Sequence, residues 1–121
     1  MRDMEVKRGD ILWIDLPGQA GTSLQSGRRP CVCVSTDKAN GTSPVINILP
    51  GTSRMNKAGF PVHMTVHPDE INGYLGKDTI FLAEQISTVP KRNIVMKAGH
   101  IPEGSRAMEE IDRIIRRQLS L

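Results

Sequence analysis

The sequence predicts a mainly β (α+β) protein, a small antiparallel barrel with one helix at its C-terminus. Three observations support this fold class. Five or six short runs are rich in β-branched and apolar residues, turn signals separate them, and only the C-terminal stretch repeats with a helical period. A chain of 121 residues with no repeat and no linker is expected to form a single domain over residues 1–121.

The expected strands are bounded by turn residues. The first follows the turn Gly9-Asp10, and the second is a run after Pro30 that is apolar on both faces. Asn40-Gly41 predicts a turn over residues 37–43, and Thr88 predicts the N-cap of a short helical turn over 87–92. Strands are expected at residues 6–16, 29–35, 45–49, 61–66 and 79–86, with a short last strand at 95–97 and irregular backbone at 68–77.

The C-terminal helix has the clearest pattern in the chain. Met108, Ile111 and Ile115 recur at near 3.6 spacing with charged residues between them. Ser105 is expected to cap the N-terminus of the helix, and several arginines suit its C-terminal half. The apolar stripe is therefore expected to pack on the barrel.

Charge and composition narrow the functional classes. Sixteen Lys and Arg against thirteen Asp and Glu give +3, and all of the excess lies in residues 1–60, which suits an anionic partner. Four aromatic residues are too few for a broad base-stacking platform. The sequence has no membrane-span run and no signal-peptide core, so a cytoplasmic protein without membrane contact is expected.

Cysteine and histidine usage predicts neither a disulfide nor a metal centre. Cys31 and Cys33 share one face of a strand and are expected to be buried, reduced thiols. His63, His67 and His100 show no ligand spacing, so no metal or other cofactor is expected.

Polar side chains gather at the ends of the expected strands. Pro30 holds Arg29 extended at a loop–strand junction, which suits the presentation of a guanidinium to a phosphate, although solvated surface arginines fit equally well. Metal-free RNA cleavage needs a base for the 2′-OH proton, an acid for the 5′-oxygen and a cation at the phosphate. Thr52 and Glu84 could supply the acid or base of this reaction. Taken one at a time, however, Thr52 is typical of a turn and Glu84 of a surface carboxylate on a strand.

Four short blocks carry more information together than apart. They are Lys7-Arg8-Gly9-Asp10-Ile11-Leu12-Trp13, Gln25-Ser26-Gly27-Arg28-Arg29-Pro30, Pro50-Gly51-Thr52-Ser53 and Glu84-Gln85-Ile86-Ser87-Thr88. In this order and spacing they resemble the MazF/PemK (Kid) family of toxin endoribonucleases. The resemblance covers nearly the whole chain, and it implies an SH3-like barrel of the MazF/PemK/CcdB type that acts as a homodimer.

The resemblance also implies a function. A toxin of a type II toxin–antitoxin system would cleave single-stranded RNA at short motifs without a metal, leaving a 2′,3′-cyclic phosphate and a 5′-hydroxyl, and an acidic antitoxin would control it. The family's catalytic pair falls on Arg29 and Thr52, and its proposed base falls on Glu84. RNA contacts are expected from Ser23, Gln25, Arg28, Ser53, Arg54, Lys57 and Gln85.

The chain departs from the family at two positions. Leu24 stands where a glutamate is usual, and Leu82 where the PemK branch has an arginine, so Arg29 with Thr52 is expected to carry most of the chemistry. Two other functions stay open. A CcdB-like gyrase poison would share the fold and act through the end of its C-terminal helix. A non-catalytic RNA- or peptide-binding barrel would keep the cleft and lack the reaction.

Overall fold

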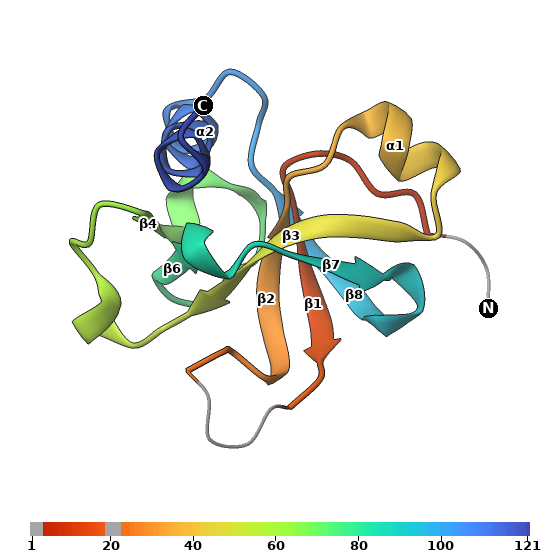
Figure 1. Ribbon diagram of the computed structural model, residues 1–121, viewed down its shortest axis with the longest axis horizontal. Coiled ribbons are helices and arrows are strands. Elements are labelled where there is room, and N and C mark those ends of the chain that lie inside the picture. The colour runs from red at the N-terminus through yellow and green to blue at the C-terminus, as the bar shows by residue number, and fades with distance from the viewer. Residues whose placement is uncertain (1–3, 19–22) are drawn as a thin grey trace.

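The sheet of the protein curls into a half-open barrel. The computed structural model describes residues 4–18 and 23–121, and within them eight strands follow the order β4-β6-β3-β2-β1-β8-β5, with β7 paired to β3. Every pairing is antiparallel, and the C-terminal helix covers one side of the sheet (Figure 1). The predicted fold class is confirmed.

The elements follow one another closely along the chain. The strands are β1 (Asp10–Leu16), β2 (Gly27–Cys33), β3 (Val45–Thr52), β4 (His63–Val66), β5 (Asn72–Gly73), β6 (Thr79–Leu82), β7 (Ser87–Pro90) and β8 (Ile94–His100). The helices of the described residues are α1 (Asp37–Thr42) and α2 (Arg106–Leu119), with 3₁₀ turns η1 (Met55–Lys57), η2 (Pro68–Glu70), η3 (Ala83–Gln85) and η4 (Lys91–Asn93).

The core has two parts, one on each face of β1 and β2. Ile11 and Val32 belong to the part beneath α2, while Leu12 and Cys31 belong to the part on the opposite face. This confirms that β2 is apolar on both faces. Because both faces of these strands are buried, the barrel holds them rigidly and fixes the positions of their ends.

The C-terminal helix forms as its periodicity predicts. Ser105 caps it, since its hydroxyl accepts from the Met108 N–H at 3.3 Å. Met108 and Ile111 are buried and Ile115 packs against the same cluster, which confirms the packing of the stripe on the barrel.

Both cysteines are free and buried, as expected. Burial raises the pKa of the Cys31 thiol to about 12, so it stays protonated and unreactive at neutral pH.

The predicted turn at residues 37–43 is wrong, because these residues form α1. Thr36 caps this helix by accepting from the Ala39 N–H. Asn40 does not turn the chain. Its side chain is buried and donates to the Ser35 carbonyl at 3.0 Å and to the Cys33 sulfur at 3.3 Å. Partners from β2 and the segment after it outweigh the local turn preference of Asn-Gly.

The predictions around residue 85 are also corrected. The strand expected to reach residue 86 ends at Leu82, so Glu84 and Gln85 lie on η3. The helical turn expected over residues 87–92 is instead the strand β7 followed by η4, because the edge of β3 offers pairing partners from Ile48↔Ser87 to Val45↔Pro90.

Other boundaries shift by smaller amounts. β1 begins four residues later than residue 6, β3 runs on through Thr52, and β8 is longer than the expected 95–97. The segment expected to be irregular contains η2 and the two-residue strand β5, which pairs with β8.

A buried carboxylate joins the start of β1 to β8. The Asp10 side chain is 3% exposed and lies 2.8 Å from His100 Nδ1 and 2.9 Å from Lys97 Nζ. It also accepts from the Lys7 N–H at 2.8 Å. Lys7 and Asp10 of the first sequence block therefore form a structural junction with β8.

Candidate active site

The ends of β2 and β3 bring two distant parts of the chain together. Cys31 pairs with Pro50 in an antiparallel register, and Arg29 and Thr52 lie two residues beyond this pair on their strands and line one pocket. Gly51 permits the close approach, because a Cβ at this position would lie 2.7 Å from the Pro30 carbonyl oxygen. The glycine of the Pro50–Ser53 block is thus required by packing.

A pocket of about 210 Å³ opens at this junction. It holds four of the predicted site residues, Arg28, Arg29, Thr52 and Ser53, and is completed by Trp13, Pro30, Gly51, Leu75, Lys77 and Thr79. Three cationic side chains therefore border a small hollow, which suits a phosphate group.

Arg29 is held in the pocket by one nitrogen. Its Nε donates to the Ser26 carbonyl at 2.9 Å, and among the described residues the guanidinium makes no other hydrogen bond. The terminal nitrogens are thus left for a ligand. Thr52 is only 2% exposed, and its hydroxyl accepts from the Arg54 N–H at 3.2 Å. The hydroxyl is therefore placed by the loop that follows β3, and Thr52 belongs to the packed interior as well as to the pocket.

Arg28 is more loosely placed than Arg29. Its Nε lies 3.0 Å from Asp15, the residue opposite it on β1, and both side chains are more than half exposed. The hydrogen bond to Asp15 raises the pKa of Arg28 above its usual value. An exposed pair of this kind contributes little to stability, so an anionic ligand can displace the carboxylate.

The remaining acidic-Gln pair lies in a second hollow. Gln25, Glu84 and Gln85 line a cavity of about 340 Å³ that also contains Leu16, Pro17, Leu24, Pro50, Ile86, Ser87, Thr88 and Val89. Pro50 lines this cavity and Gly51 lines the first, so the two hollows meet β3 at consecutive residues.

Three predicted residues line neither hollow. Ser23 and Arg54 are exposed and Lys57 is half-buried, and all three lie in the connections before β2 and after β3. The structure therefore groups Arg28, Arg29, Thr52 and Ser53 in one hollow and Gln25, Glu84 and Gln85 in the other. Ser23, Arg54 and Lys57 stay at the margins.

Comparison with known families decides the relationship. The sequence pattern described as PemK-like, MazF-like toxin of type II toxin–antitoxin systems matches residues 7–119. The chain belongs to this toxin family. The match spans nearly the entire chain, so the barrel and both hollows lie inside it.

Solved structures agree with the toxin fold. The toxin superposes on the crystal structure of MazF from Deinococcus radiodurans with a TM-score of 0.77 at 24% identity, covering 98% of this chain and 100% of that one. An endoribonuclease from a mycobacterial species gives 0.74 at 18% identity, covering 98% and 94%. A mycobacterial endoribonuclease in complex with its cognate antitoxin gives 0.73 at 19%, covering 96% of each chain.

Several residues that line or adjoin the two hollows of the toxin were not among the predicted site residues. Trp13 is half-buried and lines the hollow with Arg29. Lys77 ends the segment that was expected to be irregular, and Thr79 begins β6; neither carries a local signal for this site. His63 had no ligand spacing, but its Nε2 lies 2.9 Å from the Glu84 carboxylate.

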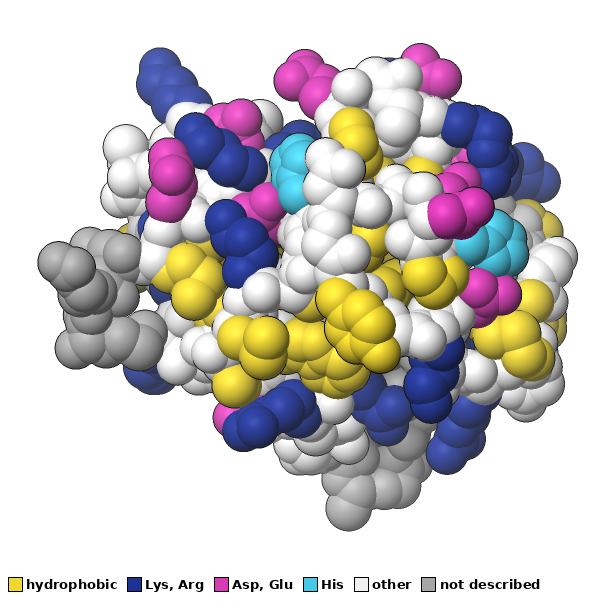
Figure 2. Space-filling view, turned by 180° about the vertical axis from the view of Figure 1, so that it is seen from behind, with side chains coloured by type: hydrophobic (Ala, Val, Ile, Leu, Met, Phe, Trp, Pro, Cys, Tyr) yellow, Lys and Arg dark blue, Asp and Glu magenta, His cyan; other side chains and the backbone are white. Residues whose placement is uncertain are grey.

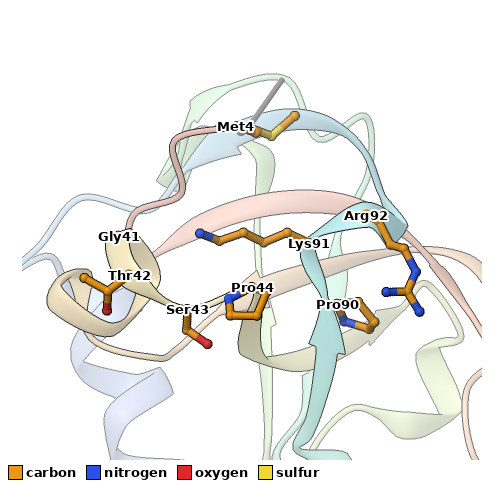
Figure 3. A pocket seen from close by; sticks show the side chains of 8 residues that line it. All are labelled: Met4, Gly41, Thr42, Ser43, Pro44, Pro90, Lys91 and Arg92. Atoms are coloured by element: carbon orange, nitrogen blue, oxygen red, sulfur yellow. The ribbon is translucent and has the colours of Figure 1, made fainter. Parts of the chain in front are cut away.

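A third and larger hollow lies away from these residues. It measures about 460 Å³ and is lined by Met4, by residues 41–44 and by Pro90, Lys91 and Arg92 (Figure 3). The Lys91 ammonium reaches across it and donates to the Asn40 carbonyl near the end of α1. Lys91 therefore caps that helix, and the hollow contains none of the predicted site residues of the toxin.

The rear face of the toxin mixes apolar and basic side chains. Figure 2 shows an apolar patch near the middle of this face, bordered below by lysine and arginine side chains. Among the described residues, no three His, Cys, Asp or Glu side chains are arranged to hold a metal ion. In the same part of the chain, no helix is both long and apolar enough to cross a membrane.

Proposed function

We propose that the toxin is a metal-independent endoribonuclease that cuts single-stranded RNA at short sequence motifs. The observation that carries this proposal is the pocket that joins Arg29 to Thr52 at two adjacent strand ends. Two of the structures most similar in fold are named endoribonucleases, which supports the same activity here. Attack of a 2′-OH on the neighbouring phosphate would yield a 2′,3′-cyclic phosphate and a free 5′-hydroxyl.

The residues of the pocket fit the demands of this reaction. The Arg29 guanidinium offers its free nitrogens to the phosphate oxygens, where negative charge grows in the transition state. The Thr52 hydroxyl, which accepts from the Arg54 N–H, lines the same pocket and would hydrogen-bond the reacting phosphate. Family resemblance assigns the base to Glu84, and Ser23, Gln25, Arg28, Ser53, Arg54, Lys57 and Gln85 would contact the RNA or hold the loops that do.

Two reactions run in parallel test the proposal. Purified toxin is incubated with a defined single-stranded RNA and, separately, with gyrase and a relaxed plasmid. We expect RNA fragments with 5′-hydroxyl ends that form equally well in excess EDTA, and undisturbed supercoiling. Blocked supercoiling with intact RNA would favour the gyrase-poison alternative, while RNA binding without cleavage would favour the non-catalytic barrel.

We also propose that an acidic antitoxin segment, disordered when free, covers the same basic edge. One of the similar structures is a complex with its cognate antitoxin, which supports such a partner. Carboxylates would compete with RNA phosphate for Arg28, whose exposed partner Asp15 is easily displaced.

Replacement of Arg28 with glutamate tests this competition. Arg28→Glu is expected to weaken RNA and antitoxin binding together, each by about tenfold, with a smaller salt dependence. Calorimetry with the co-produced antitoxin and a non-cleavable RNA measures both, and Arg113→Glu on α2 is the matched control. Loss of RNA binding alone would show that the two ligands use different surfaces.

We also propose that the toxin is cytoplasmic and that it acts as a homodimer. Met96 is 53% exposed and pairs with Trp13, which lines the pocket. Tyr74 is 79% exposed, and its N–H donates to the carbonyl of Ala98, also on β8, at 3.0 Å. Apolar side chains this close to the cleft suit burial against a second copy. Light scattering at micromolar concentration is expected to give twice the chain mass, and Met96→Lys should give the monomer. A monomeric wild-type protein would contradict the dimer.

A further inference from the structure

The turn η3 touches both of the loops that flank the cleft. It is three residues long, lies between β6 and β7, and carries Glu84 and Gln85 next to each other. Their side chains reach different segments: Gln85 contacts the connection before β2, and Glu84 contacts the connection after β3 through His63. These are the two connections expected to hold RNA.

Gln85 makes a two-point contact with backbone. Its Oε1 accepts from the Gln25 N–H at 2.8 Å, and its Nε2 donates to the Ser23 carbonyl at 3.2 Å. One side-chain amide thus bonds a backbone N–H and a backbone carbonyl two residues apart, as the backbone of a neighbouring β-strand would do. A side chain about sixty positions away in sequence therefore sets the path of the loop that leads to Arg29.

Glu84 acts on the other loop through His63. His63 Nε2 lies 2.9 and 3.0 Å from the two carboxylate oxygens, and Nδ1 lies 2.7 Å from the Lys57 carbonyl oxygen. Because that carbonyl can only accept, Nδ1 carries a proton. The ring is 6% exposed and packs near Phe60, with centroids 5.2 Å apart. A backbone hydrogen bond also joins η3 to this connection, since the Ala83 N–H donates to the Val62 carbonyl at 3.0 Å.

We propose that Glu84 and Gln85 are positioning residues, which hold the two loops at a set separation and so determine which RNA sequences are cut. The inference rests on the proposed ribonuclease function and gives Glu84 a role different from the base implied by resemblance. Both side chains line the 340 Å³ hollow beside Pro50, and the connection before β2 contributes Leu24 and Gln25 to the wall of that hollow. Loosening either loop changes the separation between the two loops, while the backbone of Arg29 and Thr52 stays in the strands β2 and β3.

Backbone hydrogen exchange tests the contacts without any RNA. In Gln85→Leu we expect the Gln25 amide to exchange about tenfold faster, because it loses its partner while the side-chain volume is kept. Glu84→Ala is the matched control from the same turn: it should leave the Gln25 amide unaffected and instead speed exchange over residues 54–62. Unchanged exchange in both variants would overturn the positioning role, whether or not the toxin cleaves RNA.

Cleavage kinetics separate positioning from proton transfer. For Gln85→Leu and Glu84→Ala, we expect KM to rise about tenfold with kcat within fivefold. The preference for the best motif over its single-base variants, measured by sequencing cleaved 5′ ends, should fall by a similar factor. Glu84→Gln should recover most of this loss, since an amide still bonds His63 but cannot act as a base.

If Glu84→Gln lost kcat a hundredfold with KM unchanged, Glu84 would be the base and its positioning role would be refuted. If wild-type toxin cleaved no RNA while the exchange results held, the ribonuclease proposal would fail and the loop contacts would stand.

Discussion

Arg29→Ala is expected to lower RNA cleavage by at least about a hundredfold, the usual consequence of removing a preorganised charge that stabilises a transition state. Arg29 sits at the edge of the pocket, and its loss removes one hydrogen bond to the Ser26 carbonyl. The free energy of unfolding should therefore change little, and the effect should appear in kcat. Timed cleavage of an end-labelled RNA at saturating substrate measures it.

Thr52 requires a different substitution, since it is almost fully buried. Thr52→Val keeps the branched shape and removes the hydroxyl, so a loss of kcat similar to that of Arg29→Ala is expected. Arg113→Ala is the matched control, because Arg113 lies on α2 and pairs only with Glu110 among the described residues. Undiminished cleavage by Arg29→Ala would refute the assignment of this pocket as the active site.

Asp10→Ala is expected to have the largest effect on stability. Its buried carboxylate receives the Lys97 ammonium, His100 and a backbone N–H, so its removal leaves three donors unpaired near the core. We expect the free energy of unfolding to fall by about 3 kcal/mol, which is the lower end of the loss expected when one partner of a buried ion pair is removed. The loss stays at that lower end because Lys97 and His100 are partly exposed and can hydrogen-bond to water instead.

Urea denaturation followed by circular dichroism measures this change. Asp15→Ala is the matched control on the same strand, since Asp15 is more than half exposed and its pair with Arg28 is solvated. The control should unfold at the same urea concentration as the wild type. A loss below about 1 kcal/mol for Asp10→Ala would show that the β1–β8 junction does not depend on this carboxylate.

Short-range patterns were sufficient for much of the fold. Alternating and doubly apolar runs located most strands, and the helical period with the Ser105 cap located α2, because these signals depend on neighbours within a few residues. The predictions for residues 37–43 and 87–92 were wrong because the structure there depends on residues distant in the sequence. Asn40 and the Ser87–Pro90 strand take their conformation from partners elsewhere in the fold, which outweigh local propensity.

For the candidate site too, the sequence predicted one part and only the tertiary structure showed the other. The four blocks in order identified the toxin family and pointed to Arg29 and Thr52, since motif order is written in the chain itself. Only the tertiary structure placed those two residues in one hollow with Trp13 and Lys77, put Glu84 and Gln85 in the next, and joined Glu84 to His63. These groupings depend on strand register and on side chains twenty or more residues apart, and no local pattern records which distant partner a side chain meets.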